Sequence, residues 1–298
     1  MSNLRNSATD PIPDSVIRVN AGDIELFKDV LTGACHVESA WVPLETRAWS
    51  VGQKYSLRRW GGRVLHKWLD RRGWVLVKRA QLDTDKRRVG GDWPWIGYTM
   101  VGRTRLDHLQ RCVESVIKEG VVGDFIETGV WRGGACLLMK ALLRAAGDKS
   151  RRIWLADSFA GLPAPKNESD GWDLSGHPYL MVSADTVREN FQRFGLWDER
   201  VCLLEGWFAD TLPAAPIDKL AILRLDGDLY ESTRVALESL YDRLSPGGFV
   251  IIDDYHVWPG CRRAVDEFRH KRGDSGGMEE IDGTAVAWRK PKVLEGIN

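Results

Sequence analysis

Four aspartates stand at the ends of two apolar, strand-like runs of the chain. Asp226 and Asp228 follow the first run, and Asp253 and Asp254 follow the second. Because parallel strands of one sheet deliver their carboxyl ends to the same edge, the four carboxylates should share one small volume. Like charges at such short range are costly unless a cation neutralises them or a proton is shared. The pattern therefore indicates a site for a hard divalent metal ion with oxygen ligands, with solvated loop acids or helix caps as the alternative.

A glycine-rich turn lies upstream, between a strand-like run and an apolar, helix-like run. It contains Gly129, Gly133 and Gly134. Turns of this kind bring backbone amides close to a nucleotide-type ligand. A short apolar strand beyond the turn ends in Asp157 and Ser158, where an acid can accept hydrogen bonds from ribose hydroxyls. A turn without a ligand is the alternative, but the later acids favour a ligand site.

The elements that must position these residues alternate regularly from about residue 95 onward. Strands are expected at residues 124–128, 152–156, 200–204, 220–225 and 249–252, and helices at 104–118, 134–146, 184–194, 232–244 and 260–271. This alternation predicts an α/β fold with a mostly parallel sheet. The strand-like pieces at 278–281 and 284–288 fit an antiparallel hairpin at one end of the sheet. A turn is expected at residues 245–248, before the last parallel strand.

The first part of the chain is less regular. Residues 1–50 show no sustained hydrophobic period and predict a loose N-terminal arm. Residues 51–92 predict a basic, helical extension, because apolar side chains recur at helical spacing between residues 54 and 72 with arginines and lysines mostly opposite them. We expect this helix to pack over the core with a solvated basic face. An oligomer contact, an acceptor clamp and membrane-surface contact are the alternatives.

Composition places the chain among ordinary globular proteins. Its 298 residues can bury a substantial core, 43% of them are hydrophobic, and the formal net charge is zero, which does not imply a nucleic-acid partner. The five cysteines are scattered without metal-type spacing, so we expect a reducing, cytoplasmic setting. The polar N-terminal stretch has no apolar run, and neither a signal segment nor a transmembrane segment is expected.

Three longer motifs together resemble the macrocin and novobiocin-type O-methyltransferase family. They are ETGVWRGG at residues 127–134, LDGDLYEST at 225–233, and the stretch from PGG to DDY at 246–255. The resemblance covers about residues 95–289 and leaves residues 1–90 unmatched. It implies a Rossmann-like class I methyltransferase fold, with the S-adenosylmethionine-dependent domain at residues 93–290 and a short tail at 291–298. It also implies magnesium-dependent methylation of a hydroxyl, with a sugar on a natural product or glycan favoured over a phenol.

The resemblance assigns roles to individual residues. It makes Asp226, Asp253 and Asp254 the metal ligands and Asp228 the general base. The implied cofactor contacts are Glu127, Thr128, Gly129, Trp131, Gly133 and Gly134 of the turn, Asp157 and Ser158 at the ribose, and Thr99 before the first core helix. A homo-oligomer is also implied.

The expected chemistry is an in-line displacement in which a hydroxyl attacks the methyl group of a sulfonium. A bound magnesium ion can lower the pKa of the hydroxyl and orient it, and Asp228 can accept its proton. His256 is the rival base, since it follows the second acid pair closely and imidazole titrates near neutral pH. The long segment at residues 159–179 is expected to form a lid over cofactor and acceptor. Three aromatic residues could stack against a sugar ring: Trp172, Tyr179 and Trp207.

Two other functional classes remain open at this point. Asp226-Gly227-Asp228 also resembles the acid-x-acid signature with which metal-dependent glycosyltransferases hold a nucleotide diphosphate. The glycine turn and Asp157 argue against that class, because they already provide a separate nucleotide-type site. A non-catalytic binding protein that keeps the cofactor pocket is the other alternative, and the complete set of acids argues against it.

Overall fold

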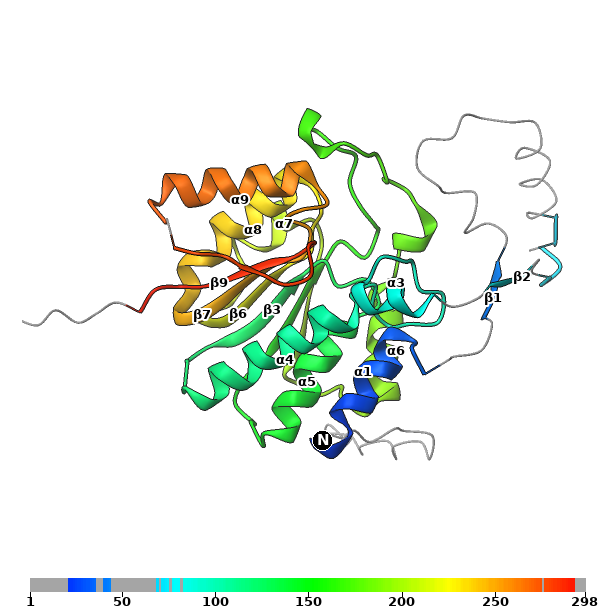
Figure 1. Ribbon diagram of the computed structural model, residues 1–298, viewed down its shortest axis with the longest axis horizontal. Coiled ribbons are helices and arrows are strands. Elements are labelled where there is room, and N and C mark those ends of the chain that lie inside the picture. The colour runs from blue at the N-terminus through cyan, green and yellow to red at the C-terminus, as the bar shows by residue number, and fades with distance from the viewer. Residues whose placement is uncertain are drawn as a thin grey trace, which may run out of the picture.

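The computed structural model describes residues 21–35, 40–43, 68–69, 71–74, 77–80, 83–274 and 276–292 (Figure 1). Most of the amphipathic helix predicted at residues 54–72 lies outside these ranges, as do residues 1–20 of the predicted arm and residues 293–298 of the predicted tail. Among the described helices, none combines the length and the apolar character needed to cross a lipid bilayer.

A seven-stranded sheet forms the centre of the domain, in the order β5-β4-β3-β6-β7-β9-β8. Its strands are β3 (Asp124–Thr128), β4 (Ile153–Asp157), β5 (Val201–Glu205), β6 (Leu220–Leu225), β7 (Leu244–Ile252), β8 (Glu279–Glu280) and β9 (Val286–Arg289). The first five strands in this order, from β5 to β7, are parallel to one another. Strand β9 pairs antiparallel with both β7 and β8. The predicted parallel sheet with an antiparallel C-terminal hairpin is confirmed.

Helices cover both faces of this sheet (Figure 1). One layer contains α1 (Ile24–Thr32), α4 (Arg103–Lys118), α5 (Gly134–Ala145) and α6 (Ala184–Arg193), and the other contains α7 (Phe208–Thr211), α8 (Tyr230–Leu240) and α9 (Pro259–Lys271). Because the sheet is covered on both sides, every residue of the central strand β6 is buried. The fold is therefore a three-layer α/β arrangement with one core on each face.

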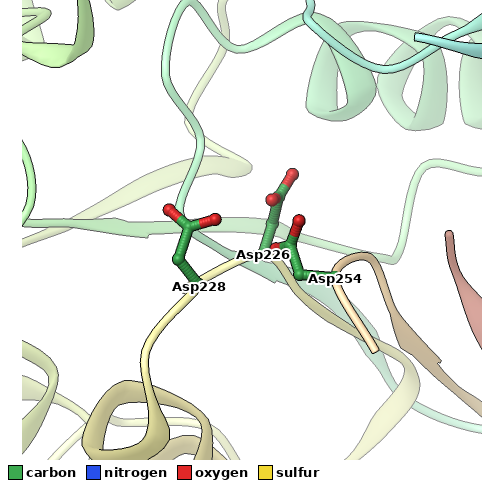
Figure 2. A group of neighbouring side chains, drawn as sticks. All are labelled: Asp226, Asp228 and Asp254. Atoms are coloured by element: carbon green, nitrogen blue, oxygen red, sulfur yellow. The ribbon is translucent and has the colours of Figure 1, made fainter. Parts of the chain in front are cut away.

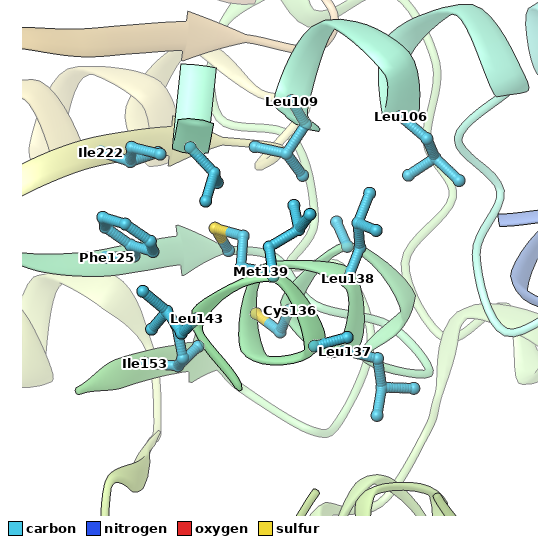
Figure 3. Packing of buried hydrophobic residues seen from close by; sticks show 14 of the residues in the cluster. Leu106, Leu109, Phe125, Cys136, Leu137, Leu138, Met139, Leu143, Ile153 and Ile222 are labelled. Carbon is cyan, nitrogen blue, oxygen red and sulfur yellow. The ribbon is translucent and has the colours of Figure 1, made fainter. Parts of the chain in front are cut away.

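The core beneath α4 and α5 shows how the sequence pattern produces the packing (Figure 3). Leu106, Leu109, Val113 and Val116 recur along one face of α4, and all four are buried. They pack with α5 against side chains of the sheet such as Phe125, in one continuous cluster. This packing holds the start of α5, and with it the glycine turn, against the carboxyl edge of the sheet.

One predicted boundary was wrong. The helix expected at residues 232–244 ends at Leu240, a short 3-10 turn (Tyr241–Arg243) follows, and β7 already begins at Leu244. The chain leaves the helix early because Leu244 pairs with Leu220 of β6. A register shift then accommodates the glycines, with Gly247 in the left-handed region at φ 84°. The turn expected at residues 245–248 is thus an irregular part of the strand.

The expectation of a loose arm also failed for part of residues 1–50. Ile24, Phe27 and Leu31 lie on one face of α1 and are buried against the core. Phe27 packs edge-to-face on Phe194 with ring centroids 5.1 Å apart. The buried ammonium group of Lys28 donates to Asp107 of α4 at 2.5 Å. The nine-residue helix is too short to stand out as a period, and it forms because its apolar face completes this core.

Three further elements precede the main domain. β1 (Ala40–Pro43) pairs antiparallel with β2 (Val77–Ala80). Helix α3 (Thr84–Val89) starts at Asp83, whose side chain accepts from the Lys86 amide. The buried guanidinium of Arg87 then donates to the carbonyls of Met100 and Val101. This contact fixes α3 to the segment that leads into α4.

Replacing Phe27 tests whether α1 belongs to the folded domain. We expect Phe27→Ala to lower the free energy of unfolding by about 3–5 kcal/mol, the usual cost of deleting a buried phenyl ring. Leu26→Ala on the same helix is the matched control, because Leu26 is 61% exposed and should change the value by less than about 0.5 kcal/mol. Urea denaturation measures both values. Equal, small effects of the two substitutions would show that α1 is dispensable.

Candidate active site

A cavity of about 540 Å³ opens at the carboxyl edge of the parallel strands. Residues that follow β3, β4, β5, β6 and β7 all line it, in agreement with the general rule for open α/β sheets. The segment before α4 closes one side through Gly90, Asp92 and Trp93, and the loop between β4 and α6 closes another. Most of the residues predicted to bind a cofactor therefore meet those predicted to bind a metal in one cavity.

The glycine turn after β3 passes very close to the end of β6. Gly129 has φ 90°, and a Cβ atom added there would lie 1.9 Å from the carbonyl oxygen of Asp226. Gly133 is also left-handed and packs against Val187 and Phe191, and Gly134 packs against Thr99. Gly129 thus allows the glycine turn to touch the acidic turn, which is the segment after β6 that carries Asp226 and Asp228. Gly133 and Gly134 allow close packing behind the cavity wall.

Asp157 lies beneath this turn. Its carboxylate accepts from the backbone amides of Val130 at 2.7 Å and Phe159 at 2.8 Å, and burial raises its pKa. Asp157 and Ser158 both line the cavity, as predicted for a contact with ribose. Because each carboxylate oxygen has two lone pairs, these bonds leave capacity for a ligand hydroxyl.

The other predicted cofactor residues divide into two groups. Thr99, Glu127, Gly129 and Trp131 line the cavity, whereas Thr128 is fully buried in the sheet and does not. Glu127 is 2% exposed, and burial raises its pKa to about 7 although Arg224 lowers it.

Three of the four aspartates converge in the cavity (Figure 2). Asp226, Asp228 and Asp254 each offer an oxygen, and these oxygens lie within 4.8 Å of one another. Burial raises the pKa of all three carboxyl groups, and with Asp226 nearby it brings the pKa of Asp228 to about 8. One buried oxygen of Asp254 has no hydrogen-bond partner among the described residues. A cluster of close carboxylates, half-buried at Asp226 and Asp228 and buried with an unpartnered oxygen at Asp254, fits the donor set of a hard divalent cation.

Asp253, the fourth aspartate, faces two arginines. Arg224 donates to one of its oxygens and Arg105 donates to the other. The guanidinium of Arg224 also donates to Glu127 at 2.5 Å and to Asp226 at 2.7 Å. The structure thus gathers Asp226 and Asp254 of the predicted metal ligands with Asp228, the predicted base. It places Asp253 in the adjoining ion-pair network.

His256, the rival base, lies outside this group. Its Nε2 atom is 2.7 Å from the carboxylate of Glu280 on the C-terminal hairpin, and its ring lies edge-on to Tyr255. It is not among the residues that line the cavity.

The predicted lid is attached to the domain rather than free. The Trp131 indole donates to the carbonyl of Tyr179 at 2.9 Å, and the Tyr179 hydroxyl donates to the carbonyl of Pro94 at 2.6 Å. The Tyr179 ring stacks on Trp93 with centroids 5.1 Å apart. Trp172 and Trp207 line the cavity as candidates for ring stacking, whereas Tyr179 does not and serves as a tether.

Among the cavity residues that sequence reasoning missed are two groups, one after β5 and one before α4. Phe208 and Ala209 come shortly after β5, just as Asp157 ends β4 and Ser158 follows it, so the same edge rule could have identified them. No sequence signal places the residues from Gly90 to Trp93 at the cavity, because their position depends on the tertiary packing of α3.

The strand order, the glycine turn after β3 and the acid at the end of β4 define a class I methyltransferase. The solved structure of the calicheamicin methyltransferase CalS11 has the same fold, at a TM-score of 0.53 and 22% identity. The chain belongs to the Macrocin-O-methyltransferase (TylF) family, whose model matches residues 21–290. The extent of the resemblance predicted from sequence, residues 95–289, was therefore too short.

Named relatives agree with this membership. The chain is 55% identical to 8-demethyl-8-(2,3-dimethoxy-alpha-L-rhamnosyl)-tetracenomycin-C 4'-O-methyltransferase of Streptomyces olivaceus, over 72% of this chain and 84% of that protein. It is 46% identical to mycinamicin III 3''-O-methyltransferase of Micromonospora griseorubida, over 72% and 87%. The solved structure of the O-methyltransferase NovP matches 90% of this chain and 98% of that chain, with 38% identity and a TM-score of 0.74. The protein is thus an S-adenosylmethionine-dependent O-methyltransferase, and the glycosyltransferase alternative is wrong.

The raised pKa of Asp228 predicts how stability depends on pH when divalent cations are removed with EDTA. The folded protein keeps a proton on this carboxyl up to about pH 8, whereas the unfolded chain releases it near pH 3.8. The free energy of unfolding should therefore fall as the pH rises between these values. Asn cannot ionise, so Asp228→Asn removes the loss of stability that comes from ionising this buried carboxyl. We expect the variant to be more stable than wild type by at least about 1 kcal/mol at pH 8, with little difference near pH 4.

Urea denaturation across this pH range measures the effect. Asp218→Asn is the control, because Asp218 is exposed and lies before β6, at the opposite edge of the sheet. Its difference from wild type should not follow the same pH profile. An Asp228→Asn variant that is less stable than wild type by the same amount at every pH would contradict the assignment.

Proposed function

We propose that this enzyme transfers a methyl group from S-adenosylmethionine to a sugar hydroxyl of a natural-product glycoside, with magnesium bound at the acid cluster. The observation that carries the proposal is the single cavity in which the glycine turn and the three converging aspartates meet. A sulfonium donor and a deprotonated hydroxyl must approach in line, which requires both sites within one enclosed volume.

The cofactor would occupy the half of the cavity beside β3, β4 and β5. Backbone groups at Gly129 and the side chain of Asp157 would contact the amino acid and ribose parts, because they lie at the ends of adjacent strands. The aromatic residues Trp207 and Phe208 follow the next strand outward, and would contact the adenine ring.

Magnesium would be held by Asp226 and Asp254, whose oxygens lie close together and include an unpartnered buried atom. When bound, such an ion acts as a Lewis acid toward the acceptor oxygens. The part of Asp253 as the third ligand stays a prediction, since its oxygens contact Arg105 and Arg224.

Asp228 would accept the proton of the acceptor hydroxyl. It lines the cavity beside Asp226 and Asp254, and a cation bound by those two carboxylates would lower the pKa of Asp228 and favour the ionised form that can accept a proton. His256 would play no direct part, because its imidazole contacts Glu280 away from the cavity.

The acceptor would be a sugar that carries a large apolar group. One relative named above acts on a rhamnosyl tetracenomycin, as its name states. On the acceptor side of the cavity, Trp172 meets Trp258 edge-to-face with centroids 5.1 Å apart, and Leu174 and Val257 extend this apolar wall. The wall would contact the non-sugar part of the glycoside. A cytoplasmic location, supported by composition, and a homo-oligomer, supported by family resemblance, are part of the proposal.

Titration calorimetry with S-adenosylmethionine tests the cofactor half of the cavity. We expect wild type to bind and Asp157→Ala to bind at least about tenfold more weakly, because hydrogen bonds to charged groups contribute about 1.5–3 kcal/mol. Asp218→Ala is the control for loss of an exposed acid and should bind like wild type. Equal binding by Asp157→Ala would contradict the ribose contact.

Methyl transfer, followed by mass spectrometry, tests the acceptor and the metal. The acceptor panel comprises 8-demethyl-8-(2,3-dimethoxy-alpha-L-rhamnosyl)-tetracenomycin C, mycinamicin III and demethyldecarbamoylnovobiocin, after the names of the relatives. We expect a methylated product in at least one case. EDTA should reduce the rate about a hundredfold or more and added magnesium should restore it, because a Lewis acid contributes several kcal/mol.

Two results would contradict the proposal in different ways. A rate that EDTA leaves unchanged would remove the metal from the reaction. If the protein bound S-adenosylmethionine but methylated none of these glycosides, the proposed acceptor class would be contradicted.

A further inference from the structure

One buried carboxylate fastens the middle of the loop between β4 and α6 to the domain. Asp170 is the last residue of a 3-10 turn (Glu168–Asp170) in this loop, and only 1% of it is exposed. Its backbone carbonyl accepts from the Trp172 amide at 2.8 Å. The loop thus has a buried anchor immediately before a tryptophan of the cavity wall.

The side chain of Asp170 reaches the start of α8. Its Oδ1 atom accepts from the Tyr230 amide at 2.7 Å, and its Oδ2 atom accepts from the Asn167 amide at 3.3 Å. Tyr230 is the first residue of α8, whose own N-cap position, Leu229, has no side chain that can accept a hydrogen bond. The first amides of a helix lack partners within the helix, and the helix dipole favours a negative charge there. Asp170 therefore caps α8 from a distant part of the chain.

Helix α9 leaves room for this carboxylate only because Gly260 has no side chain. A Cβ atom at Gly260 would lie 2.2 Å from Oδ1 of Asp170 and 3.0 Å from the Tyr230 nitrogen. The loop, the start of α8 and the start of α9 meet at this point.

The acidic turn ends where this cap begins. Asp228 lies two residues before Tyr230 and has φ 58°, a left-handed conformation that a non-glycine residue keeps only when its surroundings hold it. On the other side of the cap, Trp172 contacts Trp258, the residue before α9. The same carboxylate thus borders both the turn that carries Asp228 and the apolar wall of the acceptor side.

We propose that Asp170 is a positioning residue for methyl transfer: it holds the Asp228 turn through the Tyr230 amide and holds Trp172 against Trp258 through its own turn. This inference rests on the proposed function for its effect on turnover. The contacts that define it can be tested without any acceptor.

Hydrogen exchange tests the anchor in the full-length protein. Asp170→Ala and Gly260→Ala should each speed amide exchange about tenfold or more in peptides that cover residues 227–233 and 165–173, because both open the same local contact. Asp170→Asn keeps an oxygen for the Tyr230 amide and should restore most of the protection of residues 227–233. Gly277→Ala is the control, since a Cβ atom there meets nothing within 4 Å.

Turnover tests the consequence, with whichever glycoside of the panel the wild type methylates. We expect Asp170→Ala and Gly260→Ala to lower kcat about tenfold to a hundredfold, as a small misplacement of catalytic groups does. Their affinity for S-adenosylmethionine should stay within about twofold of wild type, because the altered contact lies on the acceptor side. Asp170→Asn should recover most of kcat.

The outcomes separate this inference from the proposed function. Unchanged exchange in Asp170→Ala would overturn the anchor whether or not an acceptor is found. Faster exchange with unchanged kcat, or an equal loss of kcat and cofactor affinity that Asp170→Asn does not rescue, would reduce Asp170 to a purely structural residue. If the wild type methylates no glycoside, the exchange data still decide the anchor and the failure belongs to the proposed function.

Discussion

The carboxyl edge of the sheet depends on the buried guanidinium of Arg224. It contacts Glu127 at the end of β3, Asp226 just beyond its own strand β6, and Asp253 just beyond β7. Removing one partner from such a buried network lowers the free energy of unfolding by about 3–5 kcal/mol, because it leaves a buried charge without a partner. A single side chain therefore holds three neighbouring strand ends at fixed positions, with the glycine turn on one side and the acid cluster on the other.

This constraint explains how one cavity can serve two ligands. The strands β3 and β4 lead into the glycine turn and into Asp157 and Ser158, which offer hydrogen-bonding groups that suit a nucleoside. The strands β6 and β7 lead into carboxylates that arginine only partly neutralises, and burial together with the neighbouring carboxylates raises the pKa of Asp228 and Asp254. The reaction would take place at the boundary, where Gly129 lets the two halves touch.

Much of this arrangement could be predicted from the sequence, because strand ends and glycines have strong local signals. The alternation of apolar runs predicted the sheet, and the position of acids after β4, β6 and β7 predicted the edge on which they meet. The partners of Asp253 could not be predicted, since Arg105 is 148 residues away in sequence and reaches it only through the packing of α4. The helix at Ile24–Thr32 was missed for a similar reason, because its stability comes from tertiary contacts rather than from its own period.

The most direct test of the account is anomalous diffraction from crystals grown with manganese and S-adenosylhomocysteine, the demethylated form of the cofactor. We expect an anomalous peak from a manganese ion between Asp226 and Asp254. S-adenosylhomocysteine should lie over Gly129, with its ribose at Asp157. An occupied cofactor site without a peak at the aspartates would contradict the metal site. A nucleoside bound elsewhere would contradict the division of the cavity on which the whole account rests.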